Sequence, residues 1–157
     1  MKTHTLLLTF FLISTFFSRA QQLPPLEKIF PVGSTWKGTH EMDGEKINRK
    51  DKASIKGKVL SVSGDDIKME VQVSGHAVRI YELKVTGNNV TLVKNEGVGF
   101  IPGTKMPANL IAVQDSSGKL TADALSASLK LGYFATTTTA DGRPVKKSRC
   151  DLSMKRN

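Results

Sequence analysis

The residues that could carry chemistry are few, and their spacing does not favour it. Beyond residue 20 the chain has two histidines, His40 and His76, and its one cysteine is Cys150. His40 and Glu41 are adjacent, so on a β-strand their side chains point to opposite faces and cannot bind one metal ion together. The Cys/His spacings of zinc sites and the Gly-x-Ser-x-Gly turn of serine hydrolases are absent from the sequence. We therefore expect no catalytic residue, no metal site and no cofactor, and we expect that the protein is not an enzyme.

The cysteine lies in a C-terminal segment whose character alternates. Cys150 shares one strand face with Leu152 and Met154, whereas polar residues occupy the opposite face. This pattern predicts a buried thiol that packs as a small apolar group. An intermolecular disulfide or a reactive thiol is the alternative interpretation. One cysteine allows no intrachain disulfide, so packing must stabilise the fold.

Basic residues are the other feature that could bind a partner. The chain has 23 Lys and Arg against 14 Asp and Glu, and segments 45–58 and 143–157 are both rich in them. If the first and last strands meet, these segments form one basic face that attracts anionic polysaccharide or an anionic lipid surface. The residues predicted to carry this face are Lys46, Arg49, Lys50, Arg143, Lys147, Arg149 and Lys155. A hydrated surface without a partner is the alternative. Nucleic acid is not expected, because few aromatic side chains are present to stack on bases.

The first 20 residues have the features of a signal peptide. Lys2 precedes an apolar run at 6–17, and small residues stand at the first and third positions of Ser18-Arg19-Ala20. We expect cleavage near Ala20 and a secreted or periplasmic protein. The run is shorter than the roughly 20 residues that span a bilayer, so we expect no transmembrane segment in the mature protein. Residues 21–32 contain three prolines and are predicted to be an extended lead-in to a single domain over 33–157.

Alternation of apolar and polar residues predicts that this domain is all-β. The clearest case is 67–74, where Ile, Met and Val alternate with polar residues between turns. Strands are expected near 34–41, 45–50, 53–62, 67–74, 77–86, 89–94, 109–114, 119–123, 127–139 and 144–155. Turns are expected at 42–44, 63–66, 74–75, 87–89, 116–118 and 140–142. A helix over 120–131 is an alternative, but strand from Ser126 fits the pattern better. Successive hairpins favour a single antiparallel up-and-down barrel of about eight to ten strands, with a β-sandwich as the alternative.

The segment GSTWKGT at 33–39 resembles the start of the first strand in lipocalin-like (calycin) secreted β-barrels. This resemblance implies an interior pocket for a small apolar ligand. A large aromatic such as Trp36 near a strand start is itself expected to pack at one end of the core. The interior is predicted to be lined by Ile67, Met69, Val71, Leu83, Val85, Leu129, Leu131 and Leu152. The residues predicted to contact a ligand are Trp36, Met69, Val71, Phe100 and Tyr133, with 97–107 as a loop at the mouth.

We therefore predict a non-enzymatic β-barrel module that binds a small apolar ligand. The alternative is a basic surface protein that docks onto anionic cell-envelope or extracellular polyanions. A barrel of eight strands can also fill its interior with its own side chains, and the sequence leaves that choice open. The oligomeric state is not specified by any feature of the sequence.

Overall fold

The computed structural model describes residues 23–43, 50–99, 111–123, 125–138 and 144–157. The predicted signal peptide lies outside these residues, and of Lys50 only the backbone is described. Four of the residues singled out by the sequence also lie outside them: Lys46, Arg49, Phe100 and Arg143.

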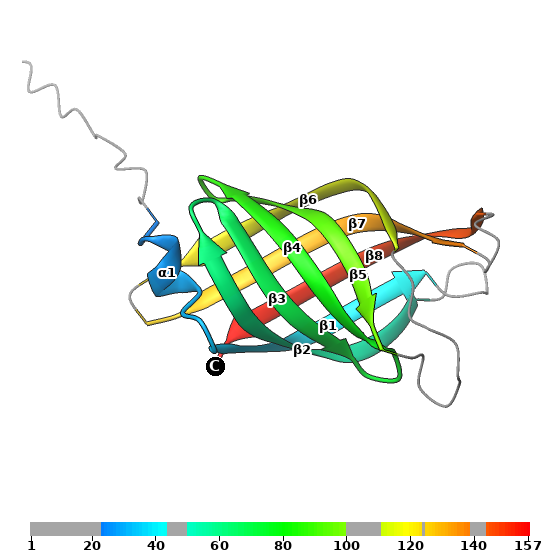
Figure 1. Cartoon of the computed structure of the whole chain (residues 1–157), viewed down its shortest axis with the longest axis horizontal. Helices are drawn as coiled ribbons and strands as arrows, with labels where there is room; N and C mark the ends of the chain where they lie inside the picture. The colour runs from blue at the N-terminus through cyan, green and yellow to red at the C-terminus, as the bar shows by residue number, and fades with distance from the viewer. Residues whose placement is uncertain (1–22, 44–49, 100–110, 124, 139–143) are drawn as a thin grey trace, which may run out of the picture.

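The chain forms a closed antiparallel barrel in which each strand pairs with the next (Figure 1). The elements are α1 (Leu26–Ile29), β1 (Thr35–Asp43), β2 (Lys50–Ser63), β3 (Asp66–Val73), β4 (Val78–Thr86), β5 (Asn89–Val98), β6 (Ala112–Ala122), β7 (Ala127–Thr138) and β8 (Pro144–Arg156). β8 also pairs with β1, which closes the sheet and leaves no open edge. The prediction of an up-and-down barrel is confirmed, with eight strands.

The predicted break at 116–118 is wrong, because β6 runs through it as one strand. The pairing of β6 with β7 shifts register between Gln114 and Ser117, which is a β-bulge, and Asp115 has a φ of 49°. The backbone N–H of Leu92 donates to Ser116 Oγ at 2.7 Å. Small polar residues that tolerate positive φ serve a bulge as well as a turn, so composition alone could not separate the two.

The lead-in is not wholly extended, because one helical turn, α1, lies within it. Prolines exclude a central strand there, yet Pro25 at the start of α1 is compatible with a helix. Ile29 and Phe30 are fully buried, and the Phe30 ring stacks on Trp36 with centroids 4.7 Å apart. Arg156 Nη1 donates to the carbonyl oxygen of Ile29 at 3.0 Å, which ties α1 to the last strand. We call the end of the barrel covered by α1 the closed end, and the opposite end the far end (Figure 1).

The interior contains the residues that the alternation predicted. Ile67, Met69, Val71, Leu83, Val85, Leu129, Leu131 and Leu152 are all buried in one cluster. Cys150 is also buried, as predicted. Because strand side chains alternate in direction, β3 contributes every second residue to this core, whereas β6 buries only Leu120 and Ala122 at its end.

Closure of the barrel depends on a glycine in β1. Gly38 pairs with Met154 of β8, and a Cβ atom placed on Gly38 would lie 1.8 Å from the carbonyl oxygen of Ser153. No side chain fits that space without moving the backbone of β8. The close approach of the first and last strands therefore requires glycine at this position.

Candidate functional site

An interior cavity of about 140 Å³ lies toward the far end of the barrel. Closure of the sheet brings together residues from strands distant in sequence, because their inward positions face the same space. The lining residues are His40, Met42, Val73, His76, Tyr81, Asn95, Ile111, Tyr133, Ala135, Ser148 and Cys150. Six of these residues carry a hydroxyl, amide or imidazole group, although most of the wall surface that faces the cavity is apolar.

Tyr133 is the centre of a buried polar cluster in this wall. Its hydroxyl oxygen lies 3.0 Å from the hydroxyl oxygen of Tyr81 and 3.3 Å from His40 Nε2. The two tyrosine rings meet edge to face, with centroids 6.4 Å apart. All three side chains are buried, although they come from β7, β4 and β1. The cluster offers hydrogen-bonding groups to the cavity in an otherwise apolar surrounding.

Burial keeps three ionisable side chains of the cavity wall, His40, Tyr133 and Cys150, uncharged at neutral pH. Desolvation lowers the pKa of His40 to about 4, with a further lowering by His76 and a smaller opposite effect of Asp151. Desolvation also raises the pKa of Tyr133 well above its ordinary value, and it raises the pKa of the Cys150 thiol to about 11. A thiol is nucleophilic as its thiolate, and a pKa of about 11 leaves little of Cys150 in that form at neutral pH.

A charged side chain, Arg79, lies near the start of β4, two residues before Tyr81. Arg79 Nε donates to Asn95 Oδ1, and Arg79 Nη2 donates to the Asn95 carbonyl oxygen at 3.0 Å. Desolvation lowers the pKa of Arg79, but a guanidinium remains protonated in proteins. Its hydrogen bonds to Asn95 fix its position beside the cavity.

The predicted ligand-contact residues are not all brought to the cavity. Tyr133 lines it, whereas Trp36, Met69 and Val71 are buried elsewhere in the core. Trp36 packs on Phe30 at the closed end. This agrees with the prediction that a large aromatic residue near a strand start packs at one end of the core.

Apart from Tyr133, the polar lining residues are not predicted by the sequence to contact a ligand. The sequence offers His40 only as a candidate for a metal site or a catalytic triad, and it gives Tyr81 and Asn95 no site role. The signal that could have found them is a polar residue at an inward position of an alternating strand, as His40 is between Gly38 and Met42.

Two of the residues predicted to bind polyanions lie together on β8 near the far end. The Lys147 ammonium lies 4.6 Å from the centre of the Phe134 ring, and the Arg149 guanidinium lies 5.4 Å from it. Arg149 also pairs with Asp151 at 3.2 Å, and Lys147 lies 4.0 Å from Asp115. These two cations are therefore already engaged by an aromatic ring and by acidic side chains.

Lys155 lies toward the other end of β8, and its side chain is exposed. The structure thus does not group Lys155 with Lys147 and Arg149. Lys50 starts β2, and the remaining predicted cations lie outside the described residues.

Within the described ranges, no group of three or more His, Cys, Asp or Glu side chains is placed to bind a metal ion. In the same part of the chain, no helix has the length and apolar character needed to cross a membrane. Comparison of the sequence with protein-family models and with curated proteins gives no match.

Proposed function

We propose that the protein is a non-enzymatic binding module that accommodates one small, uncharged, largely apolar molecule in the far-end cavity. The observation that carries this proposal is the interior cavity of about 140 Å³ bordered by the buried Tyr81–Tyr133–His40 cluster. Most of the barrel interior is filled by side chains, so the ligand must be small. Apolar cavities of about 150 Å³ in proteins bind single-ring molecules such as benzene.

The polarity of the wall favours an uncharged ligand with one polar group. The imidazole and phenols of the cluster are neutral at pH 7, and an isolated ionised ligand group would pay a large desolvation cost there. A hydroxyl or carbonyl on the ligand could instead exchange hydrogen bonds with Tyr133. This pattern, apolar walls with few polar groups that fix orientation, is typical of small-molecule sites.

The same groups support a binding role over a catalytic one. General acid–base catalysis at neutral pH favours a group whose pKa lies near 7, whereas the pKa of His40 is about 4. The pKa of Cys150, about 11, leaves little thiolate to act as a nucleophile.

The proposal also includes export, with removal of the N-terminal segment near Ala20. Its support is the charged residue, apolar run and small residues in the first 20 positions. Expression of the full chain in a secreting host, followed by N-terminal sequencing of the exported protein, tests it. The exported protein should begin near Gln21. An uncleaved protein that stays in the cytoplasm would contradict export.

Ligand binding is tested with two probes of one size, toluene and p-cresol, which differ by a hydroxyl group. Both should shift NMR signals of residues that line the cavity, and p-cresol should bind more tightly because it can bond to Tyr133. Ala135→Leu adds three carbon atoms to the cavity wall and should abolish the shifts. The matched control is Ala112→Leu, at an exposed position of β6, which should leave them unchanged. The absence of shifts in the wild-type protein, or equal shifts in both variants, would contradict the proposal.

A further inference from the structure

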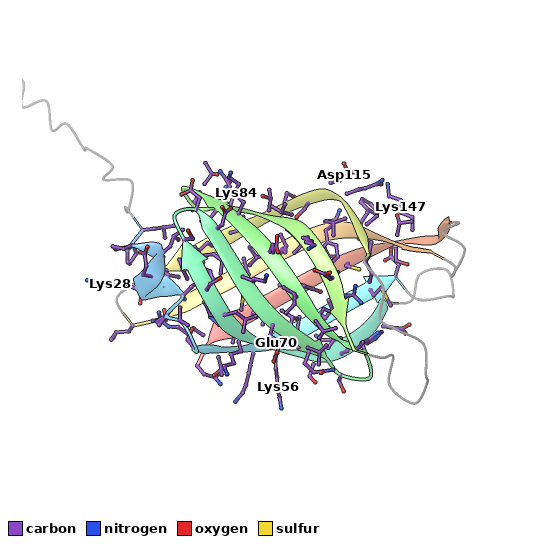
Figure 2. All side chains as sticks on the ribbon, in the orientation of Figure 1. Lys28, Lys56, Glu70, Lys84, Asp115 and Lys147 are labelled. Atoms are coloured by element: carbon purple, nitrogen blue, oxygen red, sulfur yellow. The ribbon has the colours of Figure 1, made fainter. Side chains whose placement is uncertain are left out.

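Three lysines lie side by side on the outer wall of the barrel, away from the cavity. Lys37 on β1 is directly opposite Lys56 on β2 and also directly opposite Lys155 on β8. All three side chains are exposed, and Figure 2 shows Lys56 projecting from this wall. Neighbouring strands are about 4.8 Å apart, so three positive charges are rooted along roughly 10 Å. We call these three residues the lysine row.

Among the described residues, no ion pair includes a member of the lysine row. On the neighbouring strands β3 and β4, by contrast, Lys68 pairs with Glu82 at 3.6 Å. In the strand pairing, the lysine row is flanked by the uncharged Gln72 on β3 and Ser128 on β7. Like charges directly opposite one another destabilise a sheet. The lysine row therefore costs folding stability, and an external anion would remove that cost.

A surface groove of about 350 Å³ lies beside the lysine row. Its lining residues are Thr35, Trp36, Lys37, Lys56, Gly57, Lys58, Glu70 and Gln72. The one acidic side chain among them, Glu70, is directly opposite Lys58 in the pairing of β2 and β3. The groove thus keeps a positive balance, and it gives an extended ligand a recess on the barrel wall.

A parallel line of hydroxyl groups adjoins the lysine row on the same strands. Thr39 is opposite Ser54 on one side and Ser153 on the other. This line continues to Lys130 and Lys119, which are opposite each other on β7 and β6. Thr39 follows Lys37 by two residues on β1, and two residues along a strand span about 6.7 Å. The line of hydroxyl groups therefore lies next to the lysine row, on the same face of the sheet.

We propose that the lysine row and its groove bind a linear anionic polysaccharide that lies across β2, β1 and β8. A uronic-acid chain carries one carboxylate per sugar, at a repeat close to the spacing of neighbouring strands. Its carboxylates meet the ammonium groups, and its hydroxyls meet the side chains of Thr39, Ser54 and Ser153. This surface is independent of the cavity and of any ligand bound there.

An anionic membrane fits this wall less well, because surface-bound proteins insert apolar side chains next to their basic ones. The exposed large apolar side chains of the described residues are not members of the lysine row, its groove or the hydroxyl line. They are Val32, Leu60, Val93, Val98 and Leu125. Leu60 is on β2, two residues beyond Lys58, but the lysine row, its groove and the hydroxyl line themselves expose no large apolar side chain.

The test measures binding of the whole chain to polygalacturonate by calorimetry over a range of salt concentrations, with neutral dextran as the comparison. The variant Lys37→Gln/Lys56→Gln/Lys155→Gln should bind at least about tenfold more weakly at low salt and show a shallower salt dependence. The control Lys68→Gln/Lys84→Gln/Lys94→Gln removes the same charge from β3, β4 and β5, outside the lysine row and its groove, and should keep nearly full binding. Circular dichroism confirms that both variants are folded.

Equal losses in the two variants would overturn the proposal, because they would show a response to net charge alone. Equal binding of the wild-type protein to dextran, or no binding to polygalacturonate at low salt, would overturn it as well. Preferential binding to vesicles of phosphatidylglycerol and phosphatidylcholine, with the lysine row required, would assign the surface to membranes and overturn the polysaccharide assignment.

Discussion

Replacing the central lysine of the row should stabilise the protein. In Lys37→Glu, one substitution converts two like-charge contacts, with Lys56 and Lys155, into two opposite-charge contacts. Cross-strand pairs contribute about 0.2–1 kcal/mol each, and like charges directly opposite destabilise. Two pairs therefore give a gain of about 1 kcal/mol in the free energy of unfolding at low salt. For a chain of this length, that corresponds to a rise of roughly 2–4 °C in Tm.

Urea and thermal unfolding, each followed by circular dichroism at low and high salt, measure this effect. The gain should shrink at high salt, because exposed charges are screened. The control Lys68→Glu replaces the ion pair with Glu82 by a repulsive contact and should lower stability by a similar amount. A loss of stability in Lys37→Glu at low salt would refute the strand register from which the lysine row is inferred.

Three further predictions concern the cavity and the closure of the barrel. Burial lowers the pKa of His40 to about 4 from an ordinary 6.5. Below pH 6.5 the unfolded chain therefore binds a proton that the folded protein does not bind, so the contribution of the neutral His40 to stability is complete above pH 6.5 and is lost as the pH falls to 4. Urea titrations should show the wild-type protein losing about 3 kcal/mol more than His40→Gln over that range; parallel pH profiles would argue against a buried neutral imidazole. Gly38→Ala should lower the free energy of unfolding in urea by at least about 3 kcal/mol, because the added Cβ meets the backbone of β8. The control Gly64→Ala, in an open turn, should lower it by about 1–2 kcal/mol. Equal losses in the two variants would contradict the close approach of β1 and β8. Cys150 should react with a thiol reagent in the native state only at the rate of protein opening, and immediate labelling would contradict its burial.

The barrel could be predicted from the sequence because its strands alternate with a period of two. Ile67 to Val73 shows this most clearly, and all four of its apolar residues are buried. The continuous β6 could not be foreseen, because Ser116 and its small polar neighbours are equally suited to a turn and a bulge. The Trp36 indole was expected to pack at one end of the core, but its partner Phe30 lies in a segment that the prolines made appear extended.

The two candidate sites depend on pairings that only the closed sheet determines. Tyr133 contacts His40 across 93 positions of the chain and Tyr81 across 52. The pairing of Lys37 with Lys155 needs both the closure of β1 on β8 and one particular register, since a shift of one residue moves a side chain to the other face. The sequence predicts a basic C-terminal strand. Only the register of β8 against β1 shows that Lys155, and not Lys147 or Arg149, lies opposite another lysine.

The central claim is that the far-end cavity accommodates a small molecule. A high-resolution crystal structure of the protein isolated under native conditions, with and without added p-cresol, tests this claim most directly. The account predicts density for a small molecule within hydrogen-bond distance of the Tyr133 hydroxyl. Side chains that close the cavity in both crystals, or density for ordered water alone at saturating p-cresol, would contradict it.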